Sequence, residues 1–284
     1  MITVRDLSHD YEGKGRYAVF NVGFAIPDGK IFGFLGPSGS GKSTVQNIMT
    51  ALLPIQNGDI EYDGLSVRDL KPSFFNTVGY SFELPNLYSK LTGYENLKFF
   101  AGLFTAETDD PLRVLDAVGL KQDANKRVGR YSKGMKQRLL FARSIINKPS
   151  ILFLDEPMSG LDPTTSARIK EIILEKRAAG VTIFLTTHNM YAADELCDEV
   201  AFLHEGKIIA KDTPRNLKLA HGEKSVRVEY KTNGELATEL FFPDKEEDAR
   251  RLHELLVTNK AETVHSQEAT LEQIFVKRTG RGLS

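Results

Sequence analysis

The sequence predicts an α/β protein in which helices cover a sheet, followed by a small α+β appendage. Short apolar segments alternate with amphipathic ones from residue 151 to residue 203, which favours parallel strands joined by helices. An apolar segment that starts at residue 31 runs into a glycine-rich loop and then into a helical pattern. After about residue 221, short apolar segments among charged residues are typical of half-exposed strands. We therefore predict a large unit over residues 1–220 and a small α+β unit over residues 221–284.

Periodicity and turn residues place the individual elements. Strands are expected at residues 2–7, 18–26, 31–35, 58–64, 151–154, 181–186 and 200–203, the fourth closed by an Asp-Gly turn. Helices are expected at residues 45–53, 92–118, 139–146, 164–179 and 190–197. One face of the second helix would carry Leu97, Phe100, Ala101 and Phe104. The appendage is expected to hold strands at 226–230 and 240–242 and an amphipathic helix at 244–257.

The composition is that of an ordinary globular protein, with 41% hydrophobic and 26% charged residues. A formal net charge of -1 gives no electrostatic reason to expect nucleic acid as a partner. Cys197 is the single cysteine, which excludes a disulfide framework and fits a reducing compartment. No apolar run approaches the ~18–20 residues that cross a bilayer, and the N-terminus lacks a signal-peptide pattern. We therefore expect a cytoplasmic protein.

The most informative motif is a loop that fits G-x-x-x-x-G-K-[ST] between a predicted strand and a predicted helix. It comprises Gly36, Pro37, Ser38, Gly39, Ser40, Gly41, Lys42, Ser43 and Thr44. The glycines allow backbone N–H groups to turn toward a phosphate chain, and the helix N-terminus adds a partial positive charge. Lys42 is expected to reach the β- and γ-phosphates of ATP or GTP, and Ser43 to ligate Mg²⁺. The alternative is a turn rich in glycine and serine that matches by coincidence.

Two acidic residues, Asp155 and Glu156, directly follow the apolar segment 151–154. They are therefore predicted at the carboxyl end of a buried strand, the edge at which open α/β sheets bind ligands. Asp155 can hold Mg²⁺ through a water, because hard cations prefer oxygen ligands. Glu156 can accept a proton from the water that attacks the γ-phosphate. The alternative is a strand followed by a solvated acidic turn, which the phosphate loop upstream disfavours.

A third segment, from Tyr131 to Arg138, begins the helical run that ends near residue 146. Ser132 is a good helix N-cap, and Gly134 leaves backbone N–H groups accessible, so this helix start is a second candidate anion site. Taken by itself, the segment more often marks a capped surface helix. Its position ahead of Asp155 in the chain makes the anion site the stronger interpretation.

Together these segments resemble the ATP-binding subunit of an ABC transporter, over residues 1 to about 220. The segment from Tyr131 to Met135 resembles the family signature, and residues 159–162 match the loop after the two acids. The signature wording, Tyr-Ser-Lys-Gly-Met-Lys-Gln-Arg, is similar to the branch of exporters with ABC-2-type membrane subunits, which includes drug, sodium and polysaccharide exporters. The fold that this resemblance implies is a P-loop NTPase cassette with a mixed sheet, antiparallel N-terminal strands and a helical subdomain at about residues 83–147.

The resemblance implies roles for residues whose chemistry is ambiguous by itself. Tyr11 takes the place of an aromatic residue that stacks on adenine, although it could equally be a turn residue with a partly buried ring. His188 matches the family's switch histidine and would contact the γ-phosphate, whereas a lone histidine is more often a hydrogen-bonded structural residue. Asp162 would lie at the nucleotide and could also cap the helix that starts near Pro163.

Two departures from the family pattern have chemical consequences. Glu83 stands where the family usually has glutamine; it keeps an oxygen that can ligate Mg²⁺ but loses the amide donor and adds negative charge near the phosphates. The alternative for Glu83 is a solvated loop acid. Lys133 and Met135 replace glycine and glutamine of the signature, and Lys133 would either add positive charge near a γ-phosphate or face water. Residues 83–94 are unusually apolar for a loop, which predicts either a surface for a membrane subunit or an ordinary packed loop.

The resemblance implies ATP hydrolysis with ATP and Mg²⁺ as cofactors and with Glu156, His188 and Lys42 as catalytic residues. In the family, each ATP lies between the phosphate loop of one cassette and the signature of another. We therefore expect a head-to-tail homodimer in which Ser132 and Gly134 contact the γ-phosphate that the other copy holds.

The implied partner is a multi-span membrane permease, and the chain would reach the inner face of the cell membrane only through that subunit. The implied function is to power transport, in the direction of export. The main alternative is a soluble ABC ATPase of an assembly system such as iron–sulfur cluster biogenesis. A P-loop kinase or GTPase is more remote, because it would need neither the segment 131–138 nor Asp162 after the acids. No motif names the transported substrate or the membrane partner, and none assigns a role to the appendage.

Overall fold

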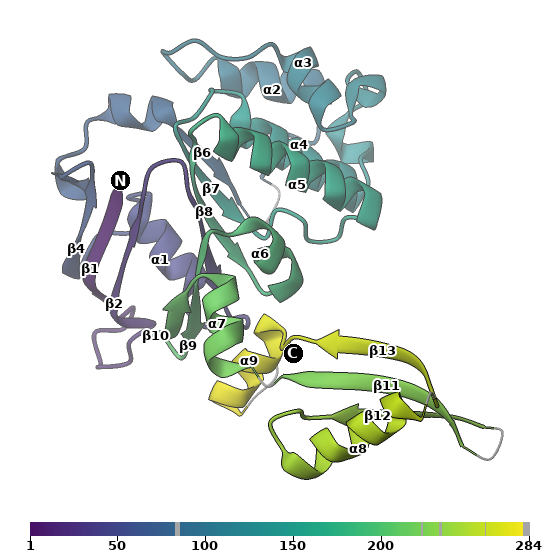
Figure 1. Cartoon of the computed structure of the whole chain (residues 1–284). Helices are drawn as coiled ribbons and strands as arrows, with labels where there is room; N and C mark the ends of the chain where they lie inside the picture. Colours follow the sequence, from purple (N-terminus) through teal and green to yellow (C-terminus); the bar gives the residue numbers. More distant parts are fainter. Residues whose placement is uncertain (83–85, 223, 233–234, 259, 281–284) are drawn as a thin grey trace. The chain divides into compact units, whose positions relative to one another are not determined.

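The structure is a computed structural model that describes residues 1–82, 86–222, 224–232, 235–258 and 260–280 (Figure 1). Its contacts divide the chain into two compact units, one from Met1 to Asp212 and one that begins at Thr213. The helix α7 (Pro214–His221) therefore belongs to the second unit. This unit begins eight residues before residue 221, the start expected from the sequence. That the two units are separate domains stays a prediction, and each unit is described by itself.

A six-stranded sheet forms the centre of the first unit. Its order is β10-β9-β3-β8-β7-β6, and its strands are β3 (Ile31–Leu35), β6 (Val78–Ser81), β7 (Ile151–Asp155), β8 (Thr182–Thr187), β9 (Glu199–His204) and β10 (Lys207–Asp212). Neighbouring strands pair in parallel, except for the antiparallel pair β9–β10. Every residue of β3 and of β8 is buried, as expected for parallel strands that are covered on both faces. The mixed sheet predicted from the sequence is confirmed.

Helices cover this sheet. They are α1 (Lys42–Met49), α4 (Lys133–Ile145), α5 (Pro163–Ala178) and α6 (Met190–Leu196), with α4 packed on β6 and β7 and α6 on β3. The expected helix at 45–53 begins three residues earlier and ends before Thr50, because Ala51 adopts a left-handed conformation with φ of 57° that a helix cannot continue through.

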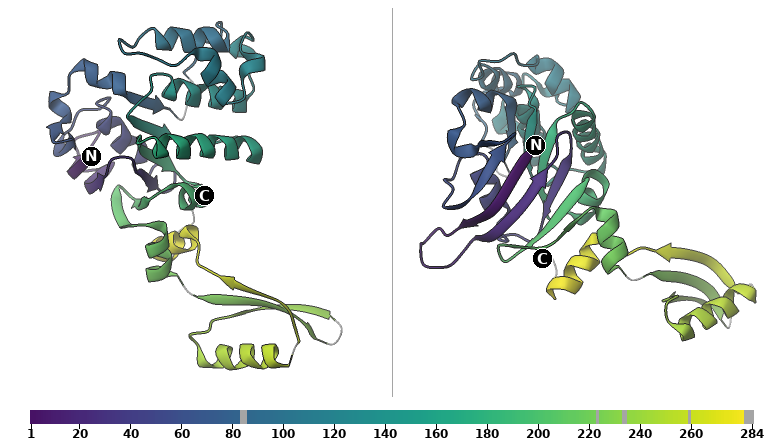
Figure 2. Two further views of the ribbon diagram at one scale, coloured as in Figure 1. Left: turned by 45° about the horizontal axis from the view of Figure 1, so that its top comes forward. Right: turned by 60° about the vertical axis from the view of Figure 1, so that its left-hand side comes forward.

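A four-stranded antiparallel sheet packs beside the central sheet, and Figure 2 shows its first two strands in purple. Its order is β2-β1-β4-β5, with β1 (Ile2–His9), β2 (Val19–Ile26), β4 (Asn57–Tyr62) and β5 (Leu65–Ser66). The shared core is aromatic: the rings of Phe24 and Phe32 stack with centroids 4.8 Å apart, and Phe184 lies 5.8 Å from Phe24. Stacked, buried rings of this kind bury large apolar areas and so help to hold the two sheets together.

The helical part between β6 and β7 corrects one prediction. The single helix expected at 92–118 is two helices, α2 (Gly93–Ala101) and α3 (Pro111–Ala117), so Phe104 lies outside both. The helix stops at Gly102, a poor helix former, and restarts where Asp110 caps the N–H of Arg113. Short 3₁₀ turns lie at Val67–Asp69, Pro72–Thr77, Lys121–Asp123 and Val128–Arg130.

The strands β6 and β10 were not expected from the sequence. β6 has only four residues, and one of them is Gly79, which has low strand propensity. A Cβ at this position would lie 2.0 Å from the carbonyl oxygen of Ser144 in α4, so only glycine permits this approach of helix and strand. The close packing of α4, rather than local propensity, therefore makes this segment a strand.

The second unit is the small α+β appendage that the sequence predicts. Its strands, in the order β12-β11-β13, are β11 (Ser225–Thr232), β12 (Glu235–Phe241) and β13 (Ala261–Gln267), and its remaining helices are α8 (Glu246–Val257) and α9 (Leu271–Thr279). Val228, Phe241 and Phe275 are among its few fully buried side chains. Among the residues with described structure, no helix of either unit has the length and apolarity needed to cross a membrane.

Candidate functional site

The sequence-predicted loop and acids meet in one cleft of about 310 Å³ in the first unit. The cleft lies at the carboxyl ends of β3, β7 and β8, where the phosphate loop, the two acids and the histidine emerge. It is lined by Tyr11, Ala18, Ser38, Gly39, Gly41, Lys42, Ser43, Thr44, Asp155, Glu156, Ser159 and His188. The topology therefore brings together groups that are far apart in the chain, as expected for the edge of an open α/β sheet.

The phosphate loop closes around its own lysine. Lys42 Nζ donates hydrogen bonds to the carbonyl oxygens of Gly36 at 2.7 Å and Pro37 at 2.9 Å, and the side chain is buried. Gly41 has φ of 106°, and a Cβ there would lie 2.5 Å from the carbonyl oxygen of Ala18, so this position requires glycine. The loop thus presents a fixed row of backbone groups to the cleft.

The N-terminus of α1 differs from the other α-helix starts of the first unit in its capping. The helix starts at Lys42 with Gly41 as N-cap, and no side chain of the described residues caps its first turn. Each other α-helix that the structure describes in the first unit has a side-chain cap, supplied by Thr92, Asp110, Ser132, Asp162 and Asn189. Because uncapped N–H groups and the helix dipole both attract anions, the end of α1 fits a polyphosphate.

Glu156 has a strained backbone that its neighbours hold in place. Its φ is 46°, in the left-handed region that residues with a side chain rarely adopt. Its N–H donates to the carbonyl oxygen of Thr186 at 3.0 Å, and its carbonyl oxygen accepts from Gln137 Nε2 at 3.1 Å. Gln137 is 5% exposed and belongs to α4, so the helix that starts at Ser132 helps to position this acid.

The Glu156 carboxylate is oriented by three groups at the end of β8. Oε2 accepts a hydrogen bond from Thr187 Oγ1 at 2.9 Å, and Oε1 accepts one from the His188 N–H at 2.8 Å. His188 Nδ1 lies 2.6 Å from the same Oε1. The neighbouring Asp155 is 6% exposed, and its Oδ1 accepts a hydrogen bond from Thr186 Oγ1. An oriented carboxylate next to a second acid suits a general base beside a magnesium ligand.

Tyr11 reaches the cleft from the loop after β1. Its hydroxyl lies 3.1 Å from Thr44 Oγ1, and its ring meets His9 edge to face with centroids 4.7 Å apart, while 60% of the residue stays exposed. Asp10 stabilises the loop by accepting hydrogen bonds from the N–H groups of Glu12 and Gly15. Burial opposes ionisation of Asp10, but these backbone bonds outweigh it and lower its pKa. A tethered, exposed ring is suited to stack on a planar base.

The signature residues do not line this cleft within the described part of the chain. Ser132 caps α4 by accepting a hydrogen bond from the Met135 N–H at 3.2 Å, and a Cβ at Gly134 would lie 3.5 Å from Leu161. Asp162 caps α5 by accepting hydrogen bonds from the Thr165 hydroxyl and N–H, which lower its pKa. Glu83 lies outside the described residues.

Two positioning residues, Thr187 and Gln137, were not singled out from the sequence. Thr187 could have been found by the same signal as the acids, because polar residues that end an apolar strand point to the ligand-binding edge. Gln137 had no such signal, because it lies inside a helix and its side chain donates to the backbone, not the carboxylate, of Glu156.

Comparisons with known proteins agree with this geometry. The family model described as ABC transporter matches residues 19–159. A fluoroquinolones export ATP-binding protein of Mycobacterium tuberculosis is 49% identical over 285 residues, which cover 100% of this chain and 95% of that protein. The chain is an ATP-binding subunit of the ABC transporter family. A lantibiotic transport ATP-binding protein of Streptococcus pyogenes is 38% identical over 211 residues, covering 74% of this chain and 89% of that protein.

Solved structures support the same assignment. A dimeric cassette in a post-hydrolysis state, bound to ADP and phosphate, superposes with a TM-score of 0.69 and 26% identity, covering 75% of this chain and 98% of that one. Another ATP-binding subunit of an ABC transporter superposes with a TM-score of 0.70 and 28% identity, over 78% and 92% of the two chains. The family, the cassette fold and the ATPase activity expected from the sequence are thereby confirmed, and the transport assignment is favoured over the assembly ATPase.

Proposed function

We propose that this ABC ATPase powers an exporter by pairing head to tail with a second copy around ATP and driving a multi-span membrane subunit. The observation that carries the proposal is that the groups needed for the reaction lie at two separate places on the first unit. The cleft holds the phosphate loop, Asp155, Glu156 and His188, whereas Ser132 and Gly134 form a second anion-suited helix start elsewhere on the same unit. A second copy that supplies this helix start would complete the shell of donors around the γ-phosphate. The exporter names of the 49% and 38% identical relatives support the direction of transport.

Within the cleft, each described residue has one task in the proposed reaction. Lys42 and the N–H groups at the start of α1 bind the β- and γ-phosphates. Glu156 orients the attacking water and accepts its proton, and His188 holds the glutamate while reaching toward the γ-phosphate. Ser43 and Asp155 present the hydroxyl and carboxylate oxygens that would hold Mg²⁺, which supplies charge neutralisation at the phosphates when bound.

Replacing Tyr11 with alanine is expected to weaken ATP binding by about 5–100-fold, because the exposed ring would stack on adenine. Y11F should bind ATP within about threefold of the parent, since only the weak hydroxyl contact to Thr44 is lost. Equilibrium titration with a fluorescent ATP analogue measures both values. Unchanged affinity in Y11A would show that the ring is a turn residue without a role at the base.

Affinity purification of the tagged chain from its native host tests the transport function. The E156Q variant should be used with ATP and Mg²⁺, because slow hydrolysis prolongs the dimeric state in which the subunits stay together. The expected result is a co-purifying multi-span membrane protein, identified by mass spectrometry. Recovery of soluble partners alone would contradict the transport function and support an assembly ATPase, while leaving the ATP chemistry intact.

A further inference from the structure

A buried glutamine in the helix after the phosphate loop has unused hydrogen-bonding groups. Gln46 lies in α1, three residues after Ser43 and four after Lys42, so the three side chains share one side of the helix. The residue is 0% exposed, and neither Nε2 nor Oε1 has a hydrogen-bond partner among the residues that the structure describes. An unpaired buried amide costs stability, and such a group in a folded protein needs an explanation.

Gln46 is buried on the side of the central sheet that carries Asp155. The core on this side contains Val45 and Ile48 of α1 together with Phe153 of β7. Because side chains alternate along a strand, Asp155 lies on the same face as Phe153, two residues further toward the cleft. Gln46 follows Val45 in α1 and is buried as completely. The amide therefore lies between α1 and the strand end that supplies the acid.

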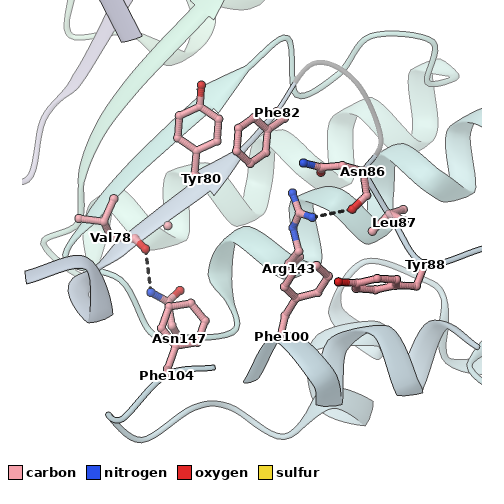
Figure 3. Close-up of a pocket in the computed structure, with 11 residues that line it drawn as sticks. Val78, Tyr80, Phe82, Asn86, Leu87, Tyr88, Phe100, Phe104, Arg143 and Asn147 are labelled. Atoms are coloured by element: carbon pink, nitrogen blue, oxygen red, sulfur yellow. Dashed lines mark hydrogen bonds between the residues drawn. The ribbon is translucent and has the colours of Figure 1, made fainter. Parts of the chain in front are cut away.

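Tyr80 of β6 forms part of the surroundings of this amide. Its ring lines a second cavity, of about 600 Å³, together with Arg143, and Figure 3 shows its hydroxyl pointing away from that arginine. The hydroxyl donates a hydrogen bond to Asn47 Oδ1 in α1 at 3.2 Å. Burial raises the pKa of this hydroxyl, the Asp155 carboxylate raises it further, and the Gln46 side chain acts in the opposite direction. Tyr80 therefore lies close to both groups.

The unused donor of Gln46 fits a magnesium site in which the acid must be held in one orientation. Mg²⁺ demands near-ideal octahedral geometry, and Ser43 and Asp155 present oxygen atoms that suit it. The carboxylates at metal sites are themselves held by further hydrogen-bond donors. Thr186 Oγ1 supplies one such donor to Asp155 Oδ1. Gln46 is a second buried polar side chain on the same side of the sheet, and its donor has no other use among the described residues.

We propose that Gln46 is a positioning residue for the magnesium site, whose Nε2 donates a hydrogen bond to the Asp155 carboxylate when Mg²⁺ and ATP are bound. The proposal rests on the proposed function in one respect, because it takes Asp155 to be the residue that holds Mg²⁺. The hydrogen bond that Nε2 lacks in this structure forms in the loaded state. The amide therefore destabilises the nucleotide-free protein and stabilises the magnesium-bound one.

The test replaces Gln46 with methionine, which has a similar length but no donor. Each chain is titrated with a fluorescent ATP analogue, once with Mg²⁺ and once with EDTA. The ratio of the two affinities measures how strongly the site holds the metal. Q46M is expected to lower this ratio about tenfold, as the loss of a hydrogen bond to a metal ligand does. Because the change removes an unpaired amide, the nucleotide-free variant should melt at the parental temperature or higher.

Ser81 provides a matched control. It is 0% exposed, and its hydroxyl also has no hydrogen-bond partner among the described residues. It follows Tyr80 in β6, however, and therefore faces the opposite side of the sheet. S81A should keep the parental ratio of affinities. Q46L repeats the test with a second apolar side chain, in case Q46M folds poorly.

A double-mutant cycle tests whether Gln46 acts through Asp155. D155N should lower the ratio of affinities by itself. Q46M added to D155N should change the ratio by less than about twofold, because the donor then has no carboxylate to hold. A further tenfold fall in the double variant would show that Gln46 acts independently of Asp155 and would overturn the inference.

The outcomes separate this inference from the proposed function. If D155N keeps the parental ratio, the magnesium role that the proposed function gives to Asp155 fails. If D155N lowers the ratio and Q46M does not, that role stands and the inference is overturned. A lower melting temperature of Q46M with a parental ratio would show that the amide serves only the fold. Equal losses of affinity with Mg²⁺ and with EDTA would show general damage to the phosphate loop, and both results also overturn the inference.

Discussion

Replacing Glu156 with glutamine is expected to lower the ATP turnover number by about 10²–10⁴-fold while ATP stays bound. Glutamine keeps the shape of the side chain: its oxygen can still accept from the His188 N–H, and its NH2 group can donate to the Thr187 hydroxyl oxygen, which donates to Glu156 in the parent. It cannot, however, take a proton from the attacking water. The strained backbone of Glu156, with φ of 46°, is unaffected because its N–H and carbonyl bonds remain. The change should therefore appear in the chemical step and spare binding.

Steady-state phosphate release and binding of a fluorescent ATP analogue measure the two effects of E156Q. Glu205 provides a matched control, because it is also a glutamate with a left-handed backbone, with φ of 47°, and lies outside the lining of the cleft. E205Q should turn over ATP at the parental rate. If E156Q hydrolysed ATP at the parental rate, Glu156 would not be the catalytic base, and catalysis would not explain its strained backbone.

Replacing Ser132 with aspartate should lower turnover by at least about 10²-fold without changing the affinity of the isolated chain for ATP. Aspartate caps a helix as well as serine does, so α4 keeps its start and the fold keeps its stability. In a head-to-tail pair, however, the new carboxylate faces the γ-phosphate that the other copy holds and repels it. Ser132 does not line the cleft of its own chain, which is why affinity should be spared.

Mixing variants makes the prediction specific for a shared site. In a mixed pair of K42A and S132D chains, one site carries both lesions and the other has an intact Lys42 and an intact Ser132. An equal mixture should therefore hydrolyse ATP faster than either variant alone. T213D, at the N-cap of α7 in the second unit, is the control and should keep parental turnover. If S132D alone retained parental turnover, the head-to-tail arrangement would be contradicted.

Much of the site was predictable because its groups are encoded in short contiguous segments. The strand β3 has the bounds 31–35 that its apolar run predicts, and Ser132 and Asp162 cap the helices that their positions favour. The phosphate loop and the acids Asp155 and Glu156 follow buried strands, and parallel strands bring their carboxyl ends to one edge. For these residues, the local sequence pattern and the sheet topology both predict the cleft at the carboxyl ends of the strands.

The sequence by itself thus determined the chemical inventory: the phosphate loop, the two acids, the helix caps and the cassette fold. The tertiary structure alone decided how these parts are oriented. The bonds from Thr187 and His188 that aim the Glu156 carboxylate join segments about thirty residues apart, and Gly79 becomes part of β6 only because α4 approaches it closely. The burial of Arg143 between Phe82 and Phe100 likewise depends on three separate elements. Motifs depend on local backbone chemistry, whereas orientation, burial and charge pairing arise from contacts between distant segments, which no local pattern records.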